Sequence, residues 1–203
     1  MKCSGFTRVE ACAVLATTGL AAMFLLPALA QGMNAMQARE NERRAQCQSN
    51  LKQVALGFHQ YIQDYDERMP PASISRKPFG WAEAVQPYVR PLAIFQCPVE
   101  RNAGSTDPKR PGYTDYWFNR NVAGAALSQV KAHSATLLAG DGDGGSPASN
   151  ARYSLNALPQ GWLQTPGSPA LRHLGGANYA FVDGHVKWLT SEEFAQLFCA
   201  GIP

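Results

Sequence analysis

Residues 47–65, CQSNLKQVALGFHQYIQDY, contain the pattern that decides the fold of this chain. Apolar residues recur there at alternating steps of four and three: Cys47, Leu51, Val54, Phe58, Tyr61 and Tyr65. This spacing is typical of one face of an α-helix, and Ala55 and Ile62 widen that face. Polar residues occupy the opposite side, so we expect a helix that is half buried against a globular domain. Pro70 and Pro71 follow it and end it, because residues before a proline are pushed out of helical geometry.

An apolar segment, Ala11–Ala30, precedes this helix and contains no charged residue. About 20 residues with a rise of 1.5 Å each match the roughly 30 Å hydrocarbon core of a bilayer, so the segment can cross a membrane once. Glu10 stands at its start. A carboxylate drawn toward the bilayer centre costs on the order of 2.5 kcal/mol or more, so Glu10 should have a partner. We expect one continuous helix from Ala11 to about Arg68, with a kink allowed at Pro27.

A second interpretation of the same segment remains open. The tripeptide Ala28-Leu29-Ala30 fits the small-x-small pattern of a signal peptidase site, and Lys2 and Arg8 would supply the positive start of a signal peptide. The mature protein would then be a secreted periplasmic or extracellular binding module, released after Ala30. An ordinary signal peptide does not need the string GFTRVE at residues 5–10, which favours a retained membrane segment.

The string GFTRVE resembles the prepilin-type cleavage and methylation signal of type IV pilins and type II secretion pseudopilins. This resemblance implies that a prepilin peptidase/N-methyltransferase cuts after Gly5 and methylates the new N-terminus at Phe6. It also implies assembly through N-terminal helices that carry Pro27, with Glu10 neutralising the Phe6 amine of a neighbouring pilin-like subunit. The position usually held by leucine in this signal is Arg8, a departure from the pattern.

Three further strings resemble a large bacterial group of pilin-like proteins, the DUF1559 group. They are residues 38–53, ARENERRAQCQSNLKQ; Phe95-Gln96-Cys97-Pro98; and His173 followed after nine residues by Asp183-Gly184, the H-X9-DG motif by which the group is known. The resemblance implies a single-pass inner-membrane subunit with a cytoplasmic N-terminus and a periplasmic head, assembling into a type II secretion pseudopilus or a type IV pilus-like filament.

We therefore predict an α+β, pilin-like fold: a long N-terminal helix, membrane-spanning and then amphipathic, packed on a small antiparallel β-sheet head with long loops. The predicted parts are a leader at residues 1–5, a transmembrane half at 6–30, its amphipathic continuation at 31–69 and a head at 70–203. Within the head, other predicted elements are a short helix at 81–89, β-prone runs at 113–119 and 135–139, a long loop at 140–169 and a short strand at 153–155.

The last strands give a sharper local prediction. Residues 178–182 and 185–189 alternate in apolar character, and Asp183-Gly184 between them favours a hairpin with a type I′ turn. Ala180 and Val182 would share one face of this hairpin. Thr190 with Glu193 forms a capping box for a final helix through Phe198.

Cysteine and metal-ligand residues leave alternatives open. Cys47 and Cys97 can form a disulfide that joins head to helix, or can be two small buried hydrophobic residues. The candidate ligands for a metal are Asp141, Asp143, His173, Asp183 and His185. The stretch from Asp141 to Gly145 is similar to a calcium loop but fails the EF-hand template, so it is either a flexible loop or a calcium loop of another kind. We otherwise expect no cofactor.

Charge and motifs exclude other functions. Lys and Arg number 18 against 15 Asp and Glu, for a net charge of +3, without a dense basic run, so we expect no nucleic-acid partner. The sequence has no nucleophile elbow, no phosphate-binding glycine loop and no zinc-protease motif. We therefore predict a non-enzymatic structural protein.

Overall fold

The computed structural model describes residues 8–100 and 102–197, and for residues 8–22 and 24–30 it describes the backbone alone. The chain divides into two compact units, Met1–Glu40 and Asn41–Pro203. Helix α1 (Arg8–Asp64) contributes residues to both units, as expected of one long helix. The predicted cleavage site, Gly5 and Phe6, lies outside the described residues.

In the first unit, the side chains described along α1 are mostly exposed, including Met33 and Met36. Wherever side chains are described, no helix combines the length and the apolar character that crossing a membrane requires. The predicted membrane segment, Ala11–Ala30, lies outside those residues apart from Met23. Glu10 and Pro27 lie within α1, and only their backbone is described.

Helix α1 ends at Asp64, four residues before the predicted Arg68. Asp66 and Glu67 adopt left-handed backbone angles, with φ of 52° and 55°. The Glu67 N–H donates to the carbonyl of Ile62 at 3.0 Å, which satisfies one of the last helical carbonyls. The chain therefore leaves the helix through this left-handed turn before it reaches the prolines.

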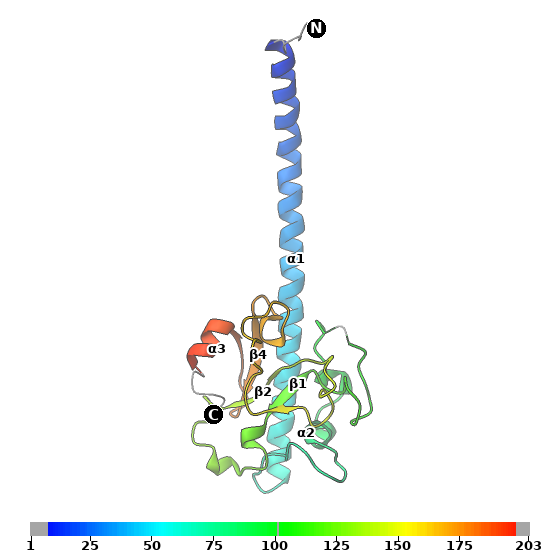
Figure 1. Ribbon diagram of the computed structural model, residues 1–203, viewed down its shortest axis with the longest axis vertical. Coiled ribbons are helices and arrows are strands. Elements are labelled where there is room, and N and C mark those ends of the chain that lie inside the picture. The colour runs from blue at the N-terminus through cyan, green and yellow to red at the C-terminus, as the bar shows by residue number, and fades with distance from the viewer. Residues whose placement is uncertain (1–7, 101, 198–203) are drawn as a thin grey trace. The chain divides into compact units, whose positions relative to one another are not determined.

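A five-stranded sheet lies beside the part of α1 that belongs to the second unit (Figure 1). Its strands are β1 (Tyr116–Asn119), β2 (Leu137–Asp141), β3 (Ser154–Leu155), β4 (Gly176–Phe181) and β5 (Val186–Thr190), in the spatial order β3-β1-β2-β4-β5. All neighbours are antiparallel except β1 and β3, which are parallel. The α+β prediction is confirmed, but the sheet is mixed, because β3 returns on the edge after a long excursion.

Short helices complete the second unit. They are α2 (Trp81–Val85), α3 (Ser191–Leu197) and the 3-10 turns η1 (Gln86–Tyr88), η2 (Leu92–Phe95), η3 (Arg120–Val122), η4 (Leu127–Gln129) and η5 (Pro169–Leu171). The helix predicted at 81–89 stops at Val85 and continues as a 3-10 turn that contains Pro87. Pro87 has no N–H to give to an α-helical hydrogen bond, which explains the change.

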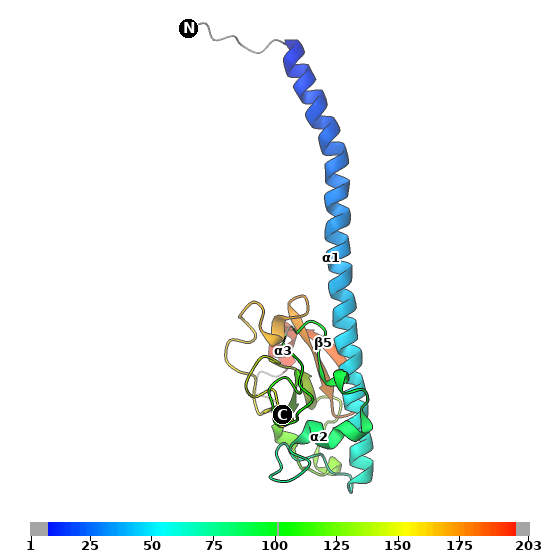
Figure 2. The same ribbon diagram turned by 90° about the vertical axis from the view of Figure 1, so that its right-hand side faces the viewer.

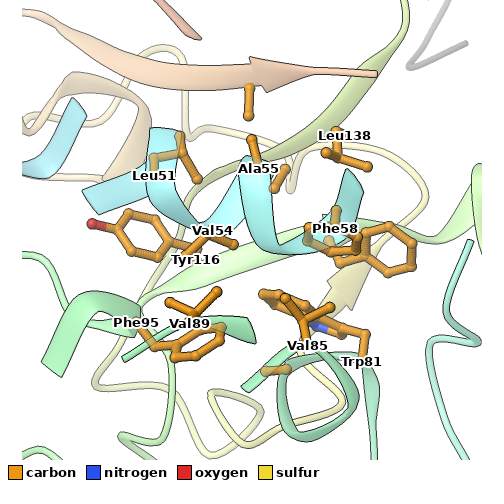
Figure 3. Packing of buried hydrophobic residues seen from close by; sticks show 14 of the residues in the cluster. Leu51, Val54, Ala55, Phe58, Trp81, Val85, Val89, Phe95, Tyr116 and Leu138 are labelled. Carbon is orange, nitrogen blue, oxygen red and sulfur yellow. The ribbon is translucent and has the colours of Figure 1, made fainter. Parts of the chain in front are cut away.

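The apolar face of α1 forms the main core with one face of the sheet and with α2. Figure 3 shows Phe58 of α1 beside Trp81 of α2, and their ring centroids are 5.3 Å apart. Phe58 also stacks on Phe118 of β1 at 5.1 Å. Cys47, Leu51 and Val54 are fully buried, whereas Tyr65 is 53% exposed because it lies beyond the end of the helix. The predicted buried face therefore holds along the helix itself.

The second face of the sheet is covered by a smaller apolar cluster. Trp117 and Tyr179 pack there, and Phe194 of α3 lies 4.8 Å from the Tyr179 ring. Figure 2 shows α3 on the side of the sheet away from α1. Ala180 and Val182 share one face, as the alternation predicted, and that face belongs to the α1 core. The sheet is thus buried on both faces.

The C-terminal hairpin and its helix cap follow the sequence closely, with one correction. Glu193 N–H donates to Thr190 Oγ1 and Thr190 N–H to Glu193 Oε2, at 3.2 and 2.9 Å, which is the predicted capping box. At the turn, Gly184 has a φ of +84° but Asp183 is not left-handed. A type I′ turn needs two such residues, so that prediction is wrong. The loop has three residues, 182–184, and the Gly184 N–H donates to the Phe181 carbonyl at 2.8 Å.

Candidate functional site

Four sequence-distant side chains meet beside the buried face of α1. Cys47 lies on the buried face of α1, and Cys97 follows η2. Their sulfur atoms are bonded in a disulfide with Cα atoms 5.1 Å apart, which closes a loop of 50 residues. Asp141 ends β2, and His173 stands in the loop before β4. One donor atom from each of these four buried residues lies within 4.8 Å of all the others. We call this group the disulfide cluster.

His173 is the centre of the disulfide cluster. Its Nε2 atom lies 3.4 Å from Asp141 Oδ2 and 3.5 Å from Cys97 Sγ, and its side chain has no exposed surface. The loop that carries it is tight: Leu174 and Gly175 both have positive φ, and the His173 N–H donates to the Gly176 carbonyl at 2.9 Å. The His173 imidazole is therefore held between the sheet and the disulfide.

Asp141 is a carboxyl group without access to water. Its Oδ2 atom accepts hydrogen bonds from the backbone N–H and side-chain amide of Asn178, at 2.6 and 3.1 Å. Its Oδ1 atom is buried and has no hydrogen-bond partner among the described residues. Burial raises the pKa of the Asp141 carboxyl, and the neighbouring His173 opposes that rise. The site thus holds a carboxyl group that needs a positive partner to stay ionised.

A second buried carboxyl group supports the other side of the disulfide. Asp115 Oδ2 accepts a hydrogen bond from the Cys97 N–H at 2.8 Å, and Asp115 Oδ1 accepts one from Asn102 at 3.1 Å. Burial raises the pKa of Asp115 to about 6, against these two hydrogen bonds. Asp115 and Cys97 line a pocket of about 420 Å³ together with Asn50 and Gln96. This pocket therefore lies beside the Cys97 end of the disulfide.

The Asp183-Gly184 end of the motif lies elsewhere, against Lys52 and His59 of α1. A Cβ atom added to Gly184 would come within 2.7 Å of Nε2 of His59, so only glycine fits closely there. Lys52 donates to the Gly184 carbonyl at 2.5 Å. Asp183 Oδ1 lies 2.6 Å from Nδ1 of His185, and both side chains are partly exposed. This turn attaches the hairpin to the helix through its backbone.

The structure thus divides the predicted site residues between two places. His173 pairs with Asp141, while Asp183 pairs with His185 at the surface. Asp143 belongs to neither group: its Oδ1 atom accepts from the Gly145 N–H within a local turn. Asp141 and Asp143 therefore have separate partners in the stretch that is similar to a calcium loop.

Sequence reasoning did not identify Asp115 and Asn178 as partners of the disulfide cluster. Both are buried polar residues within or next to apolar runs, Asp115 just before β1 and Asn178 inside β4. A polar residue inside a strand that is buried on both faces needs a hydrogen-bond partner. That expectation is the signal that could have found them.

Comparison with known proteins gives one match. Residues 36–96 match the model of a family described as Protein of unknown function (DUF1559). The match supports the similarity to the DUF1559 group. It covers the second half of α1 and all of α2, η1 and η2. It includes Cys47 and stops one residue before Cys97. No curated protein matches the chain, and no solved structure does.

Proposed function

We propose that this protein is a pilin-like structural subunit that assembles through its N-terminal helix into a type II secretion pseudopilus or type IV pilus-like filament. The observation that carries the proposal is α1: a single 57-residue helix whose last turns are the core of an α+β head. The prepilin-like string at residues 5–10 and the DUF1559 match add support. In this proposal the protein has no catalytic role.

The disulfide cluster and the Asp183-Gly184 turn support the same function mechanically. Both join the head to α1, one through the Cys47–Cys97 bond and the other through Lys52 and His59. A subunit held in a filament by its helix must transmit force from helix to head. Two separate attachments to one helix meet that requirement.

Processing and assembly follow from the N-terminal string. We propose cleavage after Gly5 and methylation of Phe6 by a prepilin peptidase, with the chain held in the inner membrane, its N-terminus in the cytoplasm and its head in the periplasm. Glu10 then neutralises the Phe6 amine of a neighbouring subunit. An unpaired carboxylate and an unpaired amine are both costly in a membrane, and pairing removes both costs.

Mass analysis of the mature N-terminus tests processing. The protein is isolated from its host with and without the candidate peptidase. We expect a chain that starts at a methylated Phe6 only when the peptidase is present. A mature chain that starts at Gln31 would instead establish the secreted binding module.

Cross-linking between subunits tests assembly separately. Glu10→Ala should abolish cross-links between neighbouring N-terminal helices. Glu42→Ala, on an exposed position of the same helix, is the matched control and should leave them unchanged. Normal cross-linking of Glu10→Ala would refute the role of Glu10 in assembly.

A further inference from the structure

We propose that the disulfide cluster is a zinc site in the reduced protein, with Cys47, Cys97, Asp141 and His173 as the four ligands. In the oxidised protein the Cys47–Cys97 bond occupies the same place. The protein would therefore exist in two alternative states: in one the two cysteines are bonded to each other, and in the other both bind a metal ion. This proposal stands on the geometry of the second unit and does not depend on filament assembly.

The ligand set suits zinc. Zinc binds thiolate sulfur at about 2.3 Å and imidazole nitrogen or carboxylate oxygen at about 2.0–2.2 Å, in a tetrahedron. Those bond lengths place neighbouring ligand atoms roughly 3.3–3.8 Å apart. His173 Nε2 is already 3.4 Å from Asp141 Oδ2 and 3.5 Å from Cys97 Sγ. Two edges thus already match those of a zinc tetrahedron, and all four donor atoms lie within 4.8 Å of one another, so zinc binding requires mainly that the two bonded sulfurs separate.

The surroundings prepare Asp141 to act as a ligand. Asn178 holds Oδ2 with two hydrogen bonds, which orients the carboxyl group toward His173. Oδ1 is buried and has no hydrogen-bond partner among the described residues, which is costly for a carboxylate. A cation in the cluster would remove that cost. Hydrogen bonds of this kind to ligating carboxylates are the usual support of metal sites.

Charge balance also favours a divalent cation. Two thiolates and one carboxylate bring three negative charges into a buried space, and isolated buried charges are strongly unfavourable. Zinc offsets two of them. The Arg172 guanidinium acts electrostatically on Asp141 and favours its ionised form. Zinc therefore leaves one of the three negative charges uncompensated among the ligands, and the nearby Arg172 is itself paired with Glu100.

Reducing the Cys47–Cys97 disulfide, so that both sulfurs become available to zinc, requires a dithiol reductant. The reductant transfers two electrons and two protons to the Cys47–Cys97 bond and becomes a disulfide itself, leaving two thiols on the protein. Zinc then binds both sulfurs, and the two thiol protons leave to solvent. In this proposal the reductant approaches through the pocket lined by Cys97, Asn50 and Gln96.

Metal binding by the full-length protein in detergent micelles tests the proposal. One sample is reduced anaerobically with dithiothreitol, which is then removed, and the other is kept oxidised. We expect the reduced protein to bind one Zn²⁺ per chain and the oxidised protein none. Co²⁺ in place of Zn²⁺ should give the intense absorption of a tetrahedral, thiolate-bound ion, and the double variant Cys47→Ser, Cys97→Ser should lose it.

Matched variants identify the remaining ligands. His173→Gln and Asp141→Asn should each weaken zinc binding by at least about tenfold. His185→Gln and Asp143→Asn make the same changes outside the cluster and should leave the affinity unchanged. Circular dichroism reports whether each reduced variant is folded.

Three results would overturn the proposal. The first is a reduced, folded protein that binds no stoichiometric zinc. The second is zinc binding that His173→Gln and Asp141→Asn leave unchanged. The third is a reduced protein that unfolds and is not refolded by zinc, because zinc that completes the site must stabilise the folded state.

Discussion

His173 and Asp183 belong to one short motif, but they lie in opposite environments. The His173 side chain is fully buried beside Asp141, whereas Asp183 and His185 keep 36% and 43% of their side-chain surface exposed. A buried charged pair is costly to break by removing one partner, while an exposed pair contributes little. The motif therefore joins a core residue, on which the head depends, to a turn in which backbone geometry matters more than charge.

The largest expected effect is at the buried end. His173→Leu removes the imidazole beside a carboxyl group that cannot reach water, so we expect a loss of about 4 kcal/mol in the free energy of unfolding. Urea denaturation of the oxidised protein measures it. The double variant His173→Leu, Asp141→Leu should recover only part of the loss: two apolar residues can replace a buried pair with little penalty, but the buried donors of Asn178 lose their acceptor. A single variant that costs less than about 1 kcal/mol would contradict the difference between the two ends.

The next effect is at the turn and depends on the backbone. Gly184→Ala places a Cβ on a residue with φ of +84° and close to His59, so we expect a loss of about 2 kcal/mol. Gly167→Ala is the matched control, because Gly167 has a φ of +79° with open space around it. It should lose only the backbone part, about 1 kcal/mol. Equal losses in the two variants, measured by urea denaturation, would show that contact with His59 does not matter.

The difference between the two ends also explains what the sequence could predict. The hairpin, the capping box of Thr190 and Glu193, and the buried face of α1 all depend on partners a few residues apart. Such patterns fix local geometry, and the structure agrees with them. The turn type was mistaken because Asp183-Gly184 allows two loop lengths, and the choice depends on how the strands pair.

The disulfide cluster was harder to predict because consecutive members lie 32 to 50 residues apart along the chain. Asp141 illustrates the difficulty. The glycines around it indicated a loop, but strand β2 continues through Gly140 to Asp141. A Cβ on Gly140 would come within 2.8 Å of the rings of Trp117 and Tyr179. Gly140 lets two aromatic rings pack closely against strand β2. No local sequence pattern distinguishes a glycine with that role from a glycine in a turn.

A smaller effect is expected from removing the exposed charge. Asp183→Ala deletes the contact with His185 and the side-chain acceptor for the His185 N–H. Because both side chains are partly exposed, we expect a loss below about 1 kcal/mol in urea denaturation. The loss should shrink at high salt, since screening weakens exposed charges most. A loss as large as that of His173→Leu would show that the turn depends on its charges after all.

The smallest effect is a pH dependence at the contact between the turn and α1. Burial and the charge of Lys52 lower the pKa of His59, while Asp183 opposes them and His133 adds to the lowering. The folded state therefore binds fewer protons at His59 than the unfolded state does. Stability should be unaffected well above the unfolded pKa of 6.5 and should fall as the pH drops below it.

His59→Gln should flatten this part of the stability curve, measured by urea denaturation between about pH 7.5 and 5. Gln63→Ala, an exposed and uncharged position on the same helix, should keep the slope of the unaltered protein. An unchanged slope in His59→Gln would show that groups other than His59 cause the loss of stability in acid. The expected flattening would instead show that the turn, although it contributes less to stability than His173, makes the attachment of the hairpin to α1 sensitive to pH.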